Sequence, residues 1–125
     1  MLITISEQDN HYDDYCQLLK ESFTKIKRND AQELCEYVIN SKGKVKIFFD
    51  EEVKFGLKIV PVSDKLVKVI GVCASKDFRS ENVLIDIFNE LVSDKIKIIA
   101  TVDSLRKRFY ERVLGKNDFI KYELI

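Results

Sequence analysis

The chain has 125 residues, of which 46% are hydrophobic and 34% are charged, and its 21 basic and 21 acidic residues give a formal net charge of +0. This length and apolar share suit one domain, residues 1–125, that buries an ordinary core without disulfides or metals. A balanced charge is not typical of domains that bind a phosphate backbone, so nucleic acid is not the expected partner.

Strand and helix patterns alternate along the first third of the chain. Residues 2–5 are mostly apolar and precede a polar loop, which predicts a short first strand. Apolar residues from Tyr12 to Phe23 recur at helical spacing and predict one face of a helix. A second helical stripe covers residues 31–38, and Gly43 follows it as a helix-terminating glycine.

Three strand patterns come next. Residues 45–49 and 53–59 alternate apolar with other side chains, and the second run predicts a half-buried strand with Lys58 on its polar side. Residues 66–73 are more continuously apolar, so we expect a more central strand there. Gly71 inside that strand predicts a bulge or a close approach of the backbone.

The last third returns to alternating helix and strand spacing. Residues 84–91 predict a helix, and residues 95–102 predict a strand. Asp103 or Ser104 is expected to cap a further helix. Residues 119–125 close the chain as a strand. The predicted order is therefore βααβββαβαβ, an α/β (α+β) fold.

The cysteine and histidine content argues against a metal site. Cys16, Cys35 and Cys73 are odd in number and widely spaced, and His11 stands alone, so no zinc site is expected. Three buried free thiols suit a reducing compartment. The N-terminus lacks the features of a signal peptide, and no run approaches the ~20 apolar residues of a membrane span. We expect a cytoplasmic protein that does not enter the membrane.

The order of elements resembles that of the GNAT superfamily of N-acetyltransferases, and two motifs support the resemblance. The first is the segment Arg79-Ser80-Glu81-Asn82-Val83-Leu84 at a strand-to-helix junction. In the family, a loop with Arg or Gln, two residues, Gly, one residue, and Gly or Ala holds the pyrophosphate of acyl-CoA on backbone amides at a helix N-terminus. Here Asn82 and Leu84 stand at the two glycine positions, and Glu81 adds a negative charge. The resemblance implies that Arg79, Ser80 and Asn82 approach the pyrophosphate.

The second motif is Asp103, then Phe109-Tyr110, then Gly115. In the family an Asn follows the corresponding strand, and an aromatic-Tyr pair lies about two turns later. The resemblance implies that Asp103 lies beside the cofactor and that Tyr110 is the general acid for the CoA thiolate. A phenol with a pKa near ~10 can donate to a thiolate of similar basicity. It also implies that backbone N–H groups around Val72, Cys73 and Ala74 polarise the acyl carbonyl.

The resemblance implies a GNAT-like mixed, mostly antiparallel central sheet flanked by about four helices. The implied function is an acyl-CoA-dependent N-acyltransferase that transfers acetyl from acetyl-CoA to an unidentified amine or protein acceptor. The alternative is a catalytically inactive GNAT-like protein that binds a protein partner. The missing glycines, Glu81 and Asp103 favour that alternative.

Several residues have an ordinary interpretation beside the functional one. Tyr110 is either a general acid or a tyrosine at the edge of the core. Arg79 is either a phosphate ligand or a surface arginine at a helix start. The basic residues of the last predicted helix, Arg106 among them, are better explained as a solvated face than as a site that steers phosphate.

Overall fold

The computed structural model describes residues 1–125, except for the side chain of Leu105, so the inward position that its spacing predicts lies outside the described residues. The elements follow the predicted order: β1 (Leu2–Ile5), α1 (Tyr12–Thr24), α2 (Ala31–Asn40), β2 (Lys44–Asp50), β3 (Glu52–Ser63), β4 (Leu66–Ala74), α3 (Glu81–Ser93), β5 (Lys97–Val102), α4 (Ser104–Leu114) and β6 (Ile120–Leu124). The order βααβββαβαβ is therefore confirmed.

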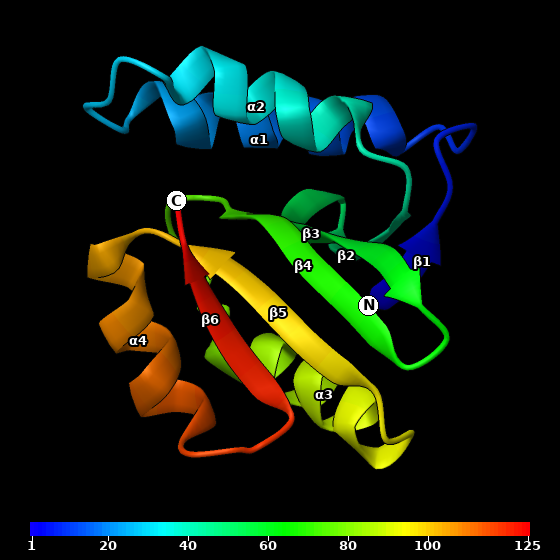
Figure 1. Ribbon diagram of the computed structural model, residues 1–125. Helices are drawn as coiled ribbons and strands as arrows, with labels where there is room; N and C mark the ends of the chain where they lie inside the picture. Colours follow the sequence, from blue (N-terminus) through cyan, green and yellow to red (C-terminus); the bar gives the residue numbers. More distant parts are fainter.

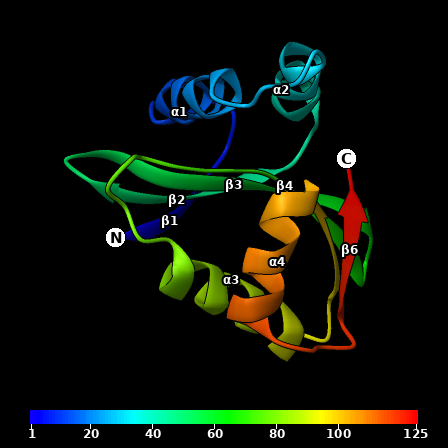
Figure 2. The same cartoon turned by 90° about the vertical axis from the view of Figure 1, so that its left-hand side faces the viewer.

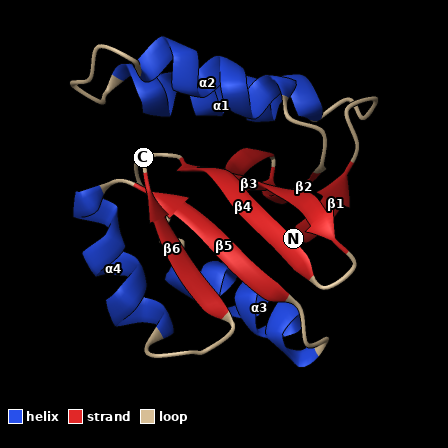
Figure 3. Ribbon diagram, viewed as in Figure 1, coloured by secondary structure: helices blue, strands red, loops and turns tan.

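The six strands form one sheet in chain order from β1 to β6 (Figure 1). Neighbouring strands are antiparallel from β1 to β4, whereas β5 lies parallel to both β4 and β6. Helices α1 and α2 cover one face, and α3 and α4 cover the other (Figures 2 and 3). The prediction of a mixed, mostly antiparallel sheet between helices is confirmed.

Strand β4 is paired on both sides along only its first half. Its residues Leu66–Val69 pair with Lys97–Ala100 of β5, and the pairing stops there. Strand β4 nevertheless continues to Ala74, while β5 continues beside β6. The two parallel strands therefore separate toward their C-terminal ends. Along its second half β4 presents backbone groups on the side from which β5 has departed, and we call this gap the strand opening.

A bulge at Gly71 lies at the start of this second half. Gly56 of β3 faces Cys73 but Lys58 faces Ile70, so β4 contains one extra residue between the two pairs. Gly71 has a φ of +62°, a conformation that favours glycine. The hydroxyl of Tyr15 donates a hydrogen bond to the carbonyl oxygen of Gly71 at 2.9 Å. The bulge predicted from Gly71 is confirmed.

Lys58 corrects the prediction of a half-buried β3 with a polar side. Its side chain is 0% exposed, because the α1–α2 layer covers the face on which it lies. The ammonium donates hydrogen bonds to the carbonyl oxygens of Val38 and Ser41 and to the hydroxyl of Tyr12, each at 2.9 Å. The last carbonyls of a helix have no intrahelical donor, so Lys58 satisfies the end of α2. Burial lowers the pKa of Lys58.

All three cysteines are free thiols, as expected from their spacing. Cys35 and Cys73 are buried and Cys16 is half-buried. Among the described residues, none of the helices has the length and apolar character needed to cross a membrane. Within the same residues no group of three or more His, Cys, Asp or Glu side chains could hold a metal ion.

Candidate functional site

Two cavities that differ in their walls lie at the strand opening. The first has a volume of about 290 Å³ and lies between the α1–α2 layer and the ends of β4, β5 and β6. Most of its wall is apolar, and we call it the apolar cavity. The side chains that define it are Phe23, Ile26, Leu34, Ile70, Val102 and Ile125.

The second cavity has a volume of about 610 Å³ and lies where β4 ends between the starts of α3 and α4. We call it the cationic cavity, because Lys25, Lys27 and Arg106 line it. Its floor contains the β4 residues Val72–Ala74, which the sequence predicted as the acyl-carbonyl site. Ser80, predicted beside the pyrophosphate, also lines it. Lys25 and Lys27 were not predicted, since they belong to an irregular loop without a motif.

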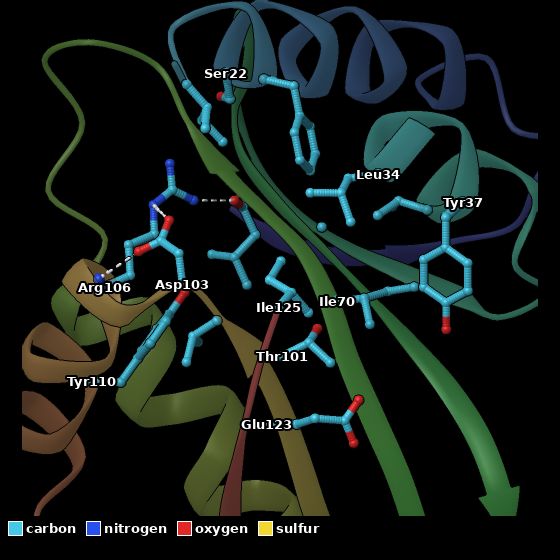
Figure 4. A pocket seen from close by; sticks show the side chains of 16 residues that line it. Ser22, Leu34, Tyr37, Ile70, Thr101, Asp103, Arg106, Tyr110, Glu123 and Ile125 are labelled. Atoms are coloured by element: carbon cyan, nitrogen blue, oxygen red, sulfur yellow. Dashed lines mark hydrogen bonds and ion pairs between the residues drawn. The ribbon is translucent and has the colours of Figure 1, made fainter. Parts of the chain in front are cut away.

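The two cavities share their central residues, so they meet at the strand opening. The residues that line both are Ser22, Ile26, Val72, Asp103, Arg106 and Tyr110. In Figure 4 Asp103, Arg106 and Tyr110 lie close together beside α4, and Leu34 and Tyr37 extend from α2. A ligand in one cavity could therefore contact a second ligand in the other cavity beside Tyr110.

The segment that resembles a pyrophosphate loop is largely helical in this chain. Helix α3 begins at Glu81, and its N-cap residue Ser80 makes no side-chain hydrogen bond. The amide of Leu84 donates to the Ser80 carbonyl at 2.9 Å, as in a regular helix. The backbone amides of the residues just before Leu84 form the first turn, and such amides have no intrahelical acceptor. Leu84 is 0% exposed and belongs to the core, which explains why a glycine is absent there.

Two residues that the resemblance assigned to the pyrophosphate lie outside the lining of both cavities. Arg79 and Asn82 are exposed at the start of α3, and within the described residues neither lines either cavity. The positively charged side chains that line the cationic cavity are instead Lys25 and Lys27 of the α1–α2 loop and Arg106, and Ser80 brings the start of α3 to it.

Tyr110 is the titratable side chain at the junction of the cavities. It is only 4% exposed, and its ring stacks on Tyr122 with centroids 6.5 Å apart. Burial raises the pKa of Tyr110 well above that of a free phenol, and the charge of Arg106 partly opposes this shift. The hydroxyl therefore keeps its proton at neutral pH and is available as a donor.

Asp103 and Arg106 form a connected pair beside Tyr110. The carboxylate of Asp103 accepts a hydrogen bond from the Arg106 backbone amide at 2.7 Å, which confirms Asp103 as the cap of α4. The Arg106 side chain crosses the strand opening and donates to the carbonyl oxygen of Val72 at 3.4 Å. The interpretation of Arg106 as part of a solvated face was therefore incomplete. Its position three residues after the cap is the signal that could have placed it at the site.

Cys73 is an unsuitable nucleophile although it lines the cationic cavity. It is 3% exposed, and burial raises the pKa of its thiol well above the usual range. A buried protonated thiol is unreactive compared with a thiolate. The groups that this part of β4 offers to a ligand are therefore those of its backbone.

Comparison with known proteins gives a fold but no close relative. No protein-family model matches the chain, and no curated protein matches it. A protein from Lactobacillus plantarum assigned as an N-acetyltransferase superposes with a TM-score of 0.69 at 15% identity, covering 90% of this chain and 81% of that one. An acetyltransferase of the GNAT family from Staphylococcus aureus superposes with a TM-score of 0.59 at 13% identity, covering 90% and 82%.

A third similar structure is an aminoglycoside 6'-N-acetyltransferase in complex with coenzyme A. It superposes with a TM-score of 0.53 at 12% identity, covering 76% of this chain and 56% of that one. At such identities the likeness concerns the fold. The chain has the fold of the GNAT superfamily of N-acetyltransferases, and the resemblance noted in its sequence is confirmed at that level.

Proposed function

We propose that this protein is an acyl-CoA-dependent N-acyltransferase that transfers an acyl group, acetyl in the simplest case, to an amine. The observation that carries the proposal is the strand opening. It joins a cavity with anion-binding groups to a cavity with apolar walls, and a buried protonated tyrosine lies at their junction. Two substrates of different chemistry are what an acyl transfer between CoA and an amine requires.

The cationic cavity suits the pyrophosphate of acyl-CoA. Lys25 and Lys27 supply positive charge from the α1–α2 loop, and Ser80 brings the N-terminus of α3, with the positive end of its dipole, to the same cavity. Glu81 opposes this, because its carboxylate lies in the first turn of the same helix. The coenzyme A complex of the similar aminoglycoside acetyltransferase supports a CoA ligand for this fold.

The second half of β4 provides backbone groups for the acyl thioester. The amide of Ser75 donates to Lys54 of β3, and Cys73 also pairs with β3. Because backbone groups alternate in direction along a strand, those of Val72 and Ala74 face the strand opening. An N–H group there can donate to the carbonyl oxygen of the thioester and stabilise the negative charge that develops on it.

The transfer itself needs few side chains. The lone pair of the neutral amine attacks the thioester carbon, the C–N bond forms, and the C–S bond breaks with its electron pair left on sulfur. The nitrogen then loses one proton and the thiolate gains one, which gives an amide and free CoA. Placing both reactants in adjoining cavities supplies much of the rate.

Tyr110 is assigned to the leaving sulfur. A thiol has a pKa near ~8.5, and complete proton transfer from even an ordinary phenol to its thiolate is uphill by about 2 kcal/mol. Burial makes the Tyr110 hydroxyl a still weaker acid. We therefore assign it as a hydrogen-bond donor that stabilises the developing thiolate, while the proton that completes the thiol comes in balance from the amine nitrogen.

A second candidate function rests on a different observation. The Arg106 side chain occupies the strand opening through its hydrogen bond to Val72, and the pyrophosphate segment lacks both glycines. Acyl-CoA must displace that hydrogen bond to reach the backbone of β4. If the contact persists, the molecule is a GNAT-like protein that binds a partner without catalysis.

Calorimetric titration with acetyl-CoA and with free CoA separates the two functions. The acyltransferase proposal expects a dissociation constant in the micromolar range, near −8 kcal/mol. The double variant Lys25→Ala/Lys27→Ala should weaken both ligands roughly tenfold, and the difference should shrink at high salt. The exposed pair Lys116→Ala/Lys121→Ala is the matched control. Failure of both ligands to bind at millimolar concentration contradicts the proposal and favours the second candidate.

A further inference from the structure

The apolar cavity restricts which amine can be the acceptor. We propose that the acceptor is a small monoamine with an apolar body, an alkylamine or an arylalkylamine, and this inference rests on the proposed function. Three observations support it: the walls of the cavity, its volume, and the engagement of its carboxylates.

The walls are apolar on both the helix side and the sheet side. Phe23, Ile26 and Leu34 are half-buried under the α1–α2 layer. On the sheet, Ile70 is 1% and Val102 is 3% exposed, so neither offers a polar partner. An apolar ligand body gains free energy in proportion to the area that it removes from water against such walls.

The mouth of the cavity continues this character. Tyr37 and Ile125 line it and are among the exposed large hydrophobic residues, at 53% and 44%. The cavity has a volume of about 290 Å³. That space accommodates one ring or a short chain with an amino group, at the lower end of ligand-pocket sizes.

The carboxylates of the cavity are already engaged. Within the described residues Asp103 and Glu123 are the acidic side chains that line it. Asp103 caps α4 and lies 3.8 Å from the Arg106 guanidinium. Glu123 lies 3.5 Å from the ammonium of Lys68. A ligand with several ammonium groups would have to compete with these partners for each carboxylate.

The charge of the nearby loop adds to this selection. Lys25 and Lys27 lie between α1 and α2 and line the adjoining cationic cavity, so they repel a polycation. Some structurally similar proteins are aminoglycoside acetyltransferases, and aminoglycosides carry several ammonium groups. The present cavity fits a different acceptor, with one amino group that reaches Tyr110 and a body that stays among apolar side chains.

The test measures CoA release from acetyl-CoA with a series of primary amines, after acetyl-CoA binding to the whole chain has been measured separately. The series comprises linear alkylamines from ethylamine to hexylamine, 2-phenylethylamine, ethanolamine, spermidine, kanamycin and a short peptide with a free N-terminus. We expect kcat/KM to rise roughly fourfold per added methylene until the cavity is full. The hydrophilic and polycationic amines should be the slowest.

Two variants locate the effect in the apolar cavity. Leu34→Glu places a carboxylate in the wall and should reduce kcat/KM for hexylamine more than tenfold, with acetyl-CoA affinity within twofold, because Leu34 does not line the cationic cavity. Tyr37→Ser, at an exposed mouth position, should reduce it several-fold without threat to folding. Val62→Ser is the control, since Val62 is 54% exposed and lies at the far end of β3.

The outcomes are distinct for the two proposals. Faster turnover of the longer and aromatic monoamines, lost in Leu34→Glu or Tyr37→Ser, supports the inference. Binding of acetyl-CoA with no turnover of apolar amines, or with faster turnover of spermidine, kanamycin or the peptide, overturns this inference alone. Absence of acetyl-CoA binding overturns the proposed function and this inference with it.

Discussion

The two halves of β4 have the same strand geometry but different surroundings. Residues Leu66–Val69 have a partner strand on both sides, so their backbone groups serve the sheet. Residues Ile70–Ala74 have β3 on one side and the strand opening on the other. The first half therefore contributes stability, whereas the second half leaves backbone groups available for a ligand. The bulge at Gly71 lies near this change, and packing from α1 and α2 holds it in place.

Of the substitutions in the second half of β4, Gly71→Ala should destabilise the fold most. An added Cβ would lie 2.6 Å from the hydroxyl of Tyr15 and would collide with Val38, and the residue would keep a positive φ. Strain of about 2 kcal/mol and overpacking of similar size should together lower the free energy of unfolding by about 4 kcal/mol. Urea denaturation measures this loss.

Gly115→Ala is the control for that substitution. Gly115 also has a positive φ, but its Cβ would meet nothing within 4 Å, so only strain of about 2 kcal/mol is expected. Equal losses in the two variants would show that packing against Tyr15 and Val38 does not hold the bulge.

Lys58→Met should release the end of α2 above the bulge. The variant leaves the carbonyls of Val38 and Ser41 without their donor, and we expect a loss of about 3 kcal/mol in unfolding free energy. Lys54→Met on the same strand is the control, since Lys54 is one-third exposed and pairs only with Glu52. It should change stability by less than about 1 kcal/mol.

The Lys58 contribution also has a predictable pH dependence. Burial lowers the pKa of Lys58 in the folded state below the ~10.4 of an unfolded lysine. Between those two values the unfolded chain binds more protons, so the contribution rises with pH and is lost as pH falls through the folded pKa. The difference in unfolding free energy between the wild type and Lys58→Met should therefore widen as the pH rises toward ~10.4, the pKa of an unfolded lysine. A difference that narrows as the pH rises would mean that the folded environment favours the charged form of Lys58 over the neutral form.

The sequence predicted the order of elements because each helix and strand carries its own spacing. Capping by Asp103 and the bulge at Gly71 were also predictable, since each follows from the chemistry of one residue. Burial of Lys58 was not, because α1 and α2 end 18 or more residues before Lys58 in the chain and only the fold places them over β3. Alternation of apolar and polar residues predicts a single strand, but it does not show which faces of the sheet are covered by helices.

The candidate site was predictable only in part for the same reason. Tyr110, Ser80 and the residues around Val72 were found through motifs and do line the cavities. Lys25 and Lys27 come from a loop whose place over the end of β4 has no local signature. Leu84 could be aligned with a glycine, but its burial shows that this position serves the core.

Tyr110→Phe tests whether the Tyr110 hydroxyl takes part in acyl transfer at the strand opening. Removal of the hydroxyl should reduce kcat roughly a hundredfold, the lower end for loss of one hydrogen-bond donor to a developing negative charge, with acetyl-CoA affinity within twofold. Tyr122→Phe is the matched control: its hydroxyl is buried with no hydrogen-bond partner among the described residues, and its ring stacks on Tyr110. Similar turnover in both variants and the wild type would remove Tyr110 from the mechanism.

Thr101→Val should have the smallest effect, and it examines the boundary between the two halves. The Thr101 hydroxyl donates to the carbonyl oxygen of Val69 at 3.2 Å, next to the last pair between β4 and β5, Val69 with Ala100. Valine keeps the branched shape but removes the donor, so we expect a loss of about 1 kcal/mol in stability and faster amide exchange at the end of β5.

The same variant shows whether the hydrogen bond does more than stabilise. If the Thr101 hydrogen bond only marks the end of the pairing between β4 and β5, acetyl-CoA affinity should stay within twofold of the wild type. A larger change in affinity would mean that the point of separation is itself tuned for the ligand. In that case the paired half of β4 would belong to the site as well, and the division between a stabilising half and a binding half would have to move toward Leu66.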